Sequence, residues 1–115
     1  MNKQRMSRID HEIQRVVGTL ISRELKDPRL GFTTVTRVET SPDLRNARIF
    51  VSIIGDRHAA RQTMDALSHA AKFLRGELGH QIALRYVPEL TFVEDRTTER
   101  AIAVSKAIRE AQGGV

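Results

Sequence analysis

A change in the spacing of apolar side chains divides residues 65–92 into two parts. In the first part apolar residues recur every three or four positions, which predicts helix, whereas the later V-P-E-L-T-F segment alternates and predicts a strand. We expect a helix, an interruption, a second helix and then the strand. Basic side chains lie near the middle of this stretch, an arrangement that favours binding to a polyanion.

The first helix is expected from about Ser7 to Lys26, because apolar residues recur there with helical spacing. Ser7 or Asp10 is a candidate for the residue that caps its start. Asp27-Pro28 should end it, since proline disfavours helical geometry in the residue before it. The apolar stripe comprises Ile9, Ile13, Val16, Val17, Leu20, Ile21 and Leu25.

Three strands are expected. The threonine- and valine-rich run over residues 32–40 predicts the first, and residues 46–54 alternate and predict the second, with a turn at 41–43 that favours an antiparallel hairpin. A third strand is predicted over residues 87–95, with Leu90 and Phe92 on one face and Pro88 at its beginning or on an edge.

Helical spacing also covers residues 60–78 and the C-terminal region. We expect a last helix capped by Asp95, Thr97 or Thr98, with an inner stripe of Ala101, Val104, Ile108 and Ala111 and a stop at Gly113-Gly114.

The order of the expected helices and strands predicts an α+β fold in which helices pack on one face of a three-stranded sheet. At 115 residues the chain fits one domain, with residues 1–6 and 113–115 frayed.

The composition restricts the functional classes. A formal charge of +5 favours a phosphate-bearing partner without establishing one. Cysteine is absent, which excludes disulfides and cysteine nucleophiles. The sequence shows neither a signal peptide nor an apolar run of the roughly 20 residues that span a bilayer, so we expect a soluble cytoplasmic protein.

Catalytic and metal-binding patterns are weak, so we expect no enzymatic activity, metal, cofactor or small-molecule substrate. In H-E-I-Q-R, Arg15 stands where a zinc-protease motif needs its second histidine. His58, His69 and His80 would be about 16 Å apart along a helix, too far apart to share one metal ion. A G-x-x-G sequence at residues 76–79 matches the loop of KH-type RNA-binding modules, but we expect it to be helical.

Three segments together resemble the ribosome-binding factor A family over nearly the whole chain. They are R-I-D-H-E-I-Q-R-V-V in the first helix, the E-L-K-D-P-R-L-G-F turn, and residues 65–95, whose V-P-E-L-T-F is the most specific piece. The resemblance implies a type II KH-like fold and binding to the free 30S subunit during late maturation and processing of 16S rRNA, with contact at the 5′-terminal helix region. It also implies a monomer off the ribosome.

The family's Ala-x-Gly kink falls by position on Ala70, Ala71 and Lys72, where this chain carries lysine in place of the usual glycine. Lysine tolerates left-handed backbone geometry less well than glycine, and it adds a positive charge. The expected RNA contacts are basic residues near this kink and around the rim of the domain: Lys72, Arg75, Arg85, His80, Arg8, Arg15, Arg45 and Arg48.

Two alternatives remain open at the level of sequence. The chain could be a protein–protein adaptor that docks on ribosomal proteins or assembly factors, with its basic residues serving solubility. A small nuclease is the other, and the lack of a convergent site disfavours it, because Glu94 and Asp95 would point to opposite faces of a strand.

Overall fold

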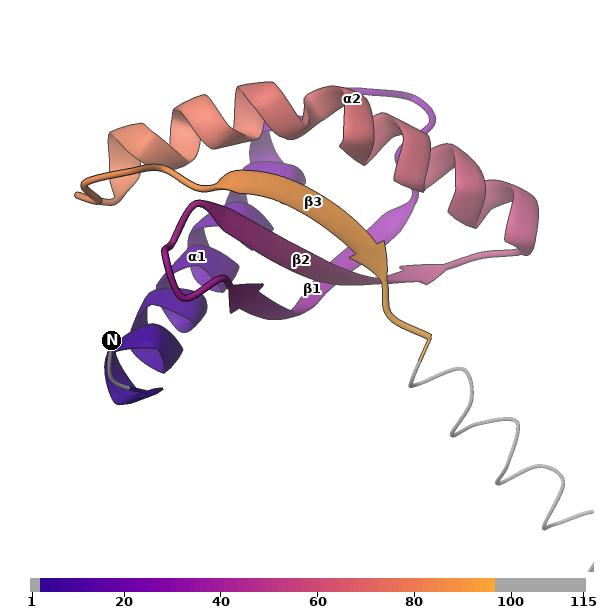
Figure 1. Ribbon diagram of the computed structural model, residues 1–115. Coiled ribbons are helices and arrows are strands. Elements are labelled where there is room, and N and C mark those ends of the chain that lie inside the picture. Colours follow the sequence, from indigo (N-terminus) through magenta and orange to yellow (C-terminus); the bar gives the residue numbers. More distant parts are fainter. Residues whose placement is uncertain (1–2, 97–115) are drawn as a thin grey trace, which may run out of the picture.

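The computed structural model describes residues 3–96, and side chains from residue 7 onward. This part forms two helices and a sheet with strand order β1-β2-β3 (Figure 1). Both helices contribute to one core against the sheet, so the predicted α+β arrangement is confirmed. The elements are α1 (Lys3–Glu24), β1 (Phe32–Thr40), β2 (Asn46–Ile54), α2 (Arg57–Gln81) and β3 (Glu89–Glu94).

The strand pairing combines both orientations. β1 and β2 form the predicted antiparallel hairpin, with a register shift between Val35 and Arg37. β3 pairs with β2 in parallel, from Asn46 opposite Glu89 to Val51 opposite Glu94. A parallel pair needs a long crossover, which α2 supplies. As a result, the beginning of β3 lies beside the turn that precedes β2, and the Glu89 amide donates to the Arg45 carbonyl oxygen at 2.9 Å.

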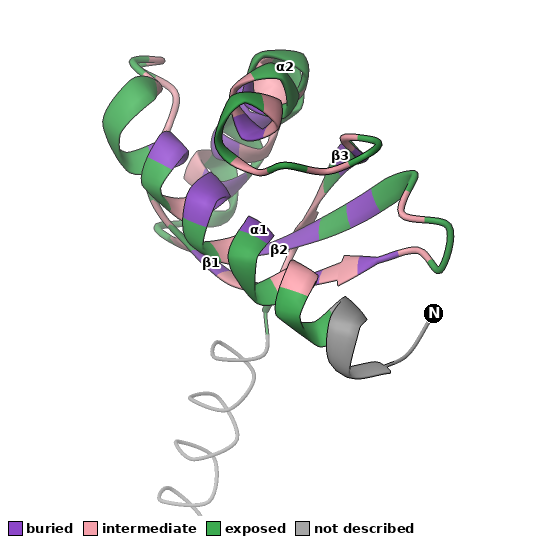
Figure 2. Ribbon diagram, turned by 90° about the vertical axis from the view of Figure 1, so that its left-hand side faces the viewer, coloured by how far each residue is buried: buried purple, intermediate pink, exposed green. Residues whose placement is uncertain are grey.

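The core lies between the helices and the inner face of the sheet (Figure 2). Most of the first helix's predicted stripe is buried, and alternate positions of β2 point inward as expected. Pro88 is fully buried directly before the edge strand β3, at the predicted position. The side chains with almost no exposure include Ile13, Val17, Ala47, Ile49, Val51, Ala60, Leu67, Leu74 and Leu78.

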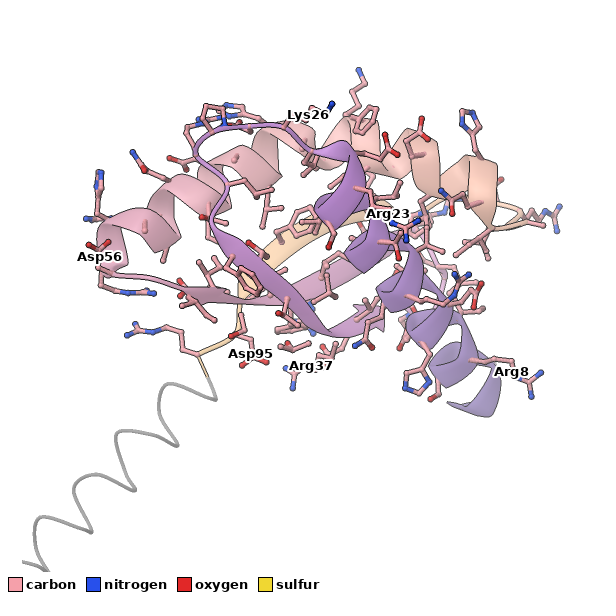
Figure 3. The ribbon with its side chains drawn as sticks, turned by 180° about the vertical axis from the view of Figure 1, so that it is seen from behind. Arg8, Arg23, Lys26, Arg37, Asp56 and Asp95 are labelled. Carbon is pink, nitrogen blue, oxygen red and sulfur yellow. The ribbon has the colours of Figure 1, made fainter. Side chains whose placement is uncertain are left out.

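The other face of the sheet carries no helix in the described part of the chain. Phe50 lies there and is only 8% exposed, because the Arg37 guanidinium lies over its ring at 4.0 Å and that of Arg48 at 5.7 Å. Arg37 points away from α2 (Figure 3). Glu39 forms ion pairs with both arginines, at 3.6 Å to Arg37 and 2.6 Å to Arg48. These charges therefore cover an apolar ring and partly neutralise one another.

The bounds of α1 differ from the sequence prediction. The helix begins at Lys3 instead of Ser7, and it ends at Glu24 instead of Lys26. Ser7 and Asp10 therefore lie inside the helix and do not cap it. Asp10 instead accepts hydrogen bonds from the backbone amide and the hydroxyl of Thr40, at 3.1 and 2.7 Å, which joins α1 to the end of β1.

The expected interruption in the second helix is wrong. One α-helix runs from Arg57 to Gln81, through Ala70, Ala71 and Lys72 (Figure 1). Lys72 has no positive φ. Alanine and lysine are strong helix formers, and without glycine this segment has no residue that favours left-handed geometry. Asp56 caps the start of this helix, and its carboxylate accepts from the amide of Ala59 at 2.8 Å.

The G-x-x-G segment is helical, as predicted. Its second glycine has a packing role, because a Cβ atom added at Gly79 would lie 2.9 Å from Cγ2 of Val87. A Cβ atom added at Gly76 would meet no other atom within 4 Å. The expected C-terminal helix, with its stripe and its Thr97 and Thr98 cap candidates, lies outside the described residues.

Candidate nucleic-acid interface

A basic groove lies where α2 passes the beginning of β3. Lys72 and Arg75 are exposed on the side of α2 that faces this strand. Together with Ala71, Glu89 and Leu90 they line a shallow pocket of about 240 Å³. The continuous helix sets this geometry, since residues three positions apart on a helix share one face.

Arg75 holds the loop that connects α2 to β3. Its Nε and Nη2 donate to the carbonyl oxygen of Val87, at 3.0 and 2.9 Å. Val87 also packs closely against Gly79, and the following Pro88 is fully buried. These contacts fix the loop against α2, and a guanidinium still has donors left for another partner.

A second pocket, of about 310 Å³, adjoins the first. Its lining includes Arg75 and Glu89, which both pockets share, together with Arg45, Asn46, Tyr86 and Val87. The Arg45 guanidinium lies over the Tyr86 ring, 5.3 Å from its centroid. We call the two adjoining pockets, with Arg45, Lys72 and Arg75 as their cations, the α2–β3 groove. Three of the eight predicted RNA contacts are thus brought to one surface.

The turn between β1 and β2 holds Arg45 at the edge of the α2–β3 groove. The Asp43 carboxylate accepts from the Ser41 hydroxyl at 2.7 Å and from the backbone amide of Arg45 at 3.1 Å. The Ser41 hydrogen bond, followed by that amide and the Arg45 charge, lowers the pKa of Asp43 below its ordinary value. Leu44 has a φ of 60°, which closes the turn in left-handed geometry. Asp43 therefore stays ionised and keeps the turn closed at neutral pH.

Two further predicted contacts flank the α2–β3 groove. Arg85 is exposed in the loop directly before Tyr86. His80 lies near the end of α2 with its side chain 78% exposed, and its Nδ1 is 3.8 Å from a carboxylate oxygen of Glu77. Neither residue lines the two pockets. Arg85 adds a positive charge beside the groove, and His80 adds an exposed imidazole.

The remaining three predicted contacts lie elsewhere. Arg8 projects from the N-terminal half of α1 (Figure 3). Arg15, also on α1, donates to Glu12 at 2.6 Å, and this hydrogen bond lowers the pKa of Glu12 and raises that of Arg15. Arg48 lies on the face of the sheet without helices and pairs with Glu39. Arg48 does not line the α2–β3 groove, but it shares a neighbouring pocket with Asn46, which lies at the edge of the groove.

Sequence reasoning missed three residues of this surface, namely Tyr86, Asn46 and Glu89. Tyr86 is the only tyrosine of the chain and stands between Arg85 and the V-P-E-L-T-F segment, which was a usable signal for an aromatic among basic residues. Asn46 and Glu89 carried no such signal. They meet because β3 pairs in parallel with β2, where the two residues are direct partners.

Other site chemistries find little support in the described residues. Among residues 3–96, no three histidine, cysteine, aspartate or glutamate side chains come together to hold a metal ion. Neither α1 nor α2 is sufficiently long and apolar to cross a membrane. The α2–β3 groove is therefore the candidate site that the geometry supports best.

The family model of ribosome-binding factor A matches residues 5–108. The ribosome-binding factor A of Lachnoclostridium phytofermentans is 43% identical over 114 residues, covering 98% of this chain and 84% of the relative. That of Gloeobacter violaceus is 44% identical over 113 residues, covering 96% and 88%.

Two solved structures are also similar. The crystal structure of ribosome-binding factor A from Thermus thermophilus has a TM-score of 0.71 and 26% identity, covering 80% of this chain and 97% of that chain. A Thermus thermophilus homology model fitted into a cryo-electron microscopy map of a complex between the 30S subunit and ribosome-binding factor A has a TM-score of 0.63 and 29% identity, covering 75% and 90%. This chain belongs to the ribosome-binding factor A family.

Proposed function

We propose that this protein is a non-catalytic assembly factor that binds the free 30S ribosomal subunit and assists late maturation and processing of 16S rRNA, at the 5′-terminal helix region. The observation that carries the proposal is the family match over residues 5–108. A similar Thermus protein, as a homology model, has been fitted into a map of a 30S complex, which supports the same partner here. The protein would act in the cytoplasm as a monomer off the ribosome, without a cofactor.

The RNA contact of this factor would be the α2–β3 groove. The cations come from two elements, with Lys72 and Arg75 on α2 and Arg45 in the turn before β2, and they line adjoining pockets at one surface. Cations in such a groove can track a phosphate backbone, and arginine can additionally bind phosphate through two donors. Arg85 and His80 would extend the contact along the loop and the end of α2. Arg8 and Arg15 on α1, and Arg48 on the sheet, would contribute long-range attraction.

Sedimentation of the purified protein with free 30S subunits, and separately with assembled ribosomes, tests this function. We expect co-sedimentation with free subunits that weakens steeply as salt is added. A triple variant, here called the groove variant, changes the groove cations Arg45 and Lys72 and the flanking Arg85 to alanine and should bind much less. A matched control removes the same charge outside the groove, at the exposed residues Arg23, Lys26 and Arg61.

Two results would contradict the proposal. Migration with assembled ribosomes alone would count against an assembly factor. An equal loss of binding in the groove variant and in the control variant would show that total charge matters and that the groove is not the site.

Docking on a protein is a second candidate function, which one exposed feature favours. Phe32 and Ile54 are cross-strand partners at one end of the β1–β2 hairpin, and they are 75% and 72% exposed. Paired exposed apolar side chains are typical of protein contacts. A pull-down with and without ribonuclease separates the two functions, because protein partners held through Phe32 and Ile54 would survive the treatment. Loss of every partner after ribonuclease would favour the RNA contact.

A further inference from the structure

Tyr86 is an exposed aromatic residue within a cationic surface. Its side chain is 56% exposed, although it directly precedes the buried segment that leads into β3. The Arg45 guanidinium lies over the ring, 5.3 Å from the centroid. Tyr86 also lines the 310 Å³ pocket of the α2–β3 groove. This volume lies at the small end of the range for ligand pockets, roughly 300–1,000 Å³.

The backbone that directly follows Tyr86 is held in place by contacts to two elements. Arg75 donates two hydrogen bonds to the carbonyl oxygen of Val87, the next residue. The Glu89 amide donates to the carbonyl oxygen of Arg45, which joins this loop to the turn that carries the covering guanidinium. Pro88 between these contacts is fully buried. The ring is therefore presented on a fixed platform, which lowers the entropic cost of binding a planar group.

Two polar side chains at the same pocket have no partner among the described residues. Asn46 forms hydrogen bonds with Ser41 only through its backbone, and Glu89 uses only its backbone amide. Both residues are exposed and line the pocket together with Tyr86. An amide can donate and accept, whereas a carboxylate only accepts. A ligand here meets an aromatic ring, two cations, one amide and one acceptor.

We propose that this pocket binds one unpaired base of single-stranded RNA, stacked on Tyr86 and read at its hydrogen-bonding edge by Asn46 and Glu89. Arg45 and Arg75 contact the phosphates on either side. Unpaired bases are commonly stacked on aromatic side chains and read at their Watson–Crick edge. The inference rests on the proposed RNA-binding function and names what the groove recognises.

The carboxylate gives the pocket a preference among bases. Glu89 accepts hydrogen bonds from the amino groups of cytosine, adenine or guanine, and acidic side chains recognise the cytosine N4 amino group in this way. Uracil has no amino group, and its one Watson–Crick donor, N3–H, lies between two carbonyl oxygens that repel a carboxylate. The pocket should therefore select an amino-bearing base over uracil.

Tyrosine fluorescence gives a direct test, because the chain contains one tyrosine and no tryptophan. The full chain is titrated at low salt with a short oligocytidylate, an oligouridylate and an abasic oligoribonucleotide of equal length. We expect the oligocytidylate to quench the fluorescence and to bind more tightly than the oligouridylate. The abasic strand carries the same phosphates and should leave the fluorescence unchanged.

Three variants sharpen the test, with binding followed by the anisotropy of labelled RNA. Tyr86→Leu should weaken oligocytidylate binding by roughly 5- to 150-fold, the range that corresponds to loss of one stacked base, and should leave abasic binding unchanged. Tyr86→Phe keeps the ring and should keep the affinity. Glu89→Gln replaces a carboxylate, which only accepts hydrogen bonds, by an amide, which both donates and accepts. It should remove the preference for cytosine over uracil.

The results separate this inference from the proposed function. Equal affinity for the abasic strand and the oligocytidylate, without quenching, would overturn the base site, while the function would stand if the groove variant still loses 30S binding. Failure to bind both the oligonucleotides and free 30S subunits would overturn the two together. The comparison of abasic and base-bearing RNA uses the unaltered protein, so it decides the matter even if Tyr86→Leu does not fold.

Discussion

Arg75 donates two hydrogen bonds to the carbonyl oxygen of Val87, from Nε at 3.0 Å and from Nη2 at 2.9 Å. This contact joins α2 to the loop before β3 across twelve residues of sequence. The residue that sequence reasoning treated only as a phosphate ligand thus also maintains the shape of the surface on which it lies. Its contribution to RNA binding cannot be measured by alanine substitution alone.

Two variants separate the structural role of Arg75, which is to hold the loop at Val87, from its role as a charge that binds RNA. Both Arg75→Ala and Arg75→Lys lose the paired donors, so each should lower the free energy of unfolding by about 0.5–1.5 kcal/mol. Only Arg75→Ala removes the charge, and only it should reduce the slope of RNA affinity against salt, by roughly 0.7 for one phosphate contact. Urea unfolding and salt titrations measure the two quantities. An unchanged stability in both variants would show that the Val87 contact does not hold the loop.

Lys72 offers a test of the uninterrupted helix. Lys72→Ala removes a charge from a strong helix former and should change stability by less than about 0.5 kcal/mol. Lys72→Gly places a glycine inside the helix, and it should cost about 1 kcal/mol because glycine disfavours helix interiors. Both variants should lose the same electrostatic contribution to RNA binding. Stabilisation by Lys72→Gly in urea unfolding would instead indicate that the segment is broken in solution.

Local patterns predicted the elements of this fold better than their pairing. The alternation over 46–54 correctly placed Ala47, Ile49 and Val51 inward, and the same alternation implied that Arg48 faces the opposite side, away from Lys72. The parallel pairing of β3 was not predictable in this way. It depends on the crossover by α2, which brings together residues that are 43 positions apart, such as Asn46 and Glu89.

The expected break at Ala70–Lys72 came from the family resemblance, and the residues present in this chain override it. Ala, Ala and Lys favour helix individually, so local propensity was the better guide at this segment. The composition of the α2–β3 groove, by contrast, needed the tertiary structure. Helical spacing already places Lys72 and Arg75 on one face, but Arg45 looks like an isolated surface cation in sequence, and only the packing of the turn against the loop brings it beside them.

Asp27 should make stability depend on pH in the acid range. Arg29 donates to its carboxylate from the backbone amide, Nε and Nη2, and these contacts lower the pKa of Asp27 from 3.8 to about 2. Because the pKa is lower in the folded state, the contribution of Asp27 is complete above its ordinary pKa and is lost as pH falls through about 2.

An Asp27→Asn variant isolates this effect. The gap in unfolding free energy between wild type and variant should be constant from pH 6 to about pH 5 and should then shrink between about pH 4 and pH 2. Urea unfolding at a series of pH values measures this gap. Glu24→Gln removes an exposed carboxylate that has no ion pair among the described residues, and it serves as the control for loss of one negative charge. If the difference in unfolding free energy between wild type and Asp27→Asn grew as pH fell, the pKa of Asp27 would be raised and not lowered in the folded state.

Gly76 and Gly79 form a matched pair one helical turn apart in α2. A Cβ atom added at Gly76 meets nothing within 4 Å, whereas one added at Gly79 would lie 2.9 Å from Cγ2 of Val87. Gly76→Ala should therefore stabilise the protein by up to about 1 kcal/mol, the helix-propensity difference between glycine and alanine. Gly79→Ala gains the same propensity but pushes against a β-branched side chain with little rotamer freedom, so it should be destabilising.

A double variant identifies the cause of the difference. Val87→Ala removes the clashing methyl groups, so Gly79→Ala should become neutral or stabilising in its presence, and the coupling should appear as non-additivity in a double-mutant cycle. The same contact sets the position of the loop that carries Tyr86, so Gly79→Ala should also weaken the quenching of tyrosine fluorescence by RNA while Gly76→Ala leaves it intact. Equal stabilisation by both alanine variants would mean that the loop does not pack on α2 at this point, and that Tyr86 has no fixed platform.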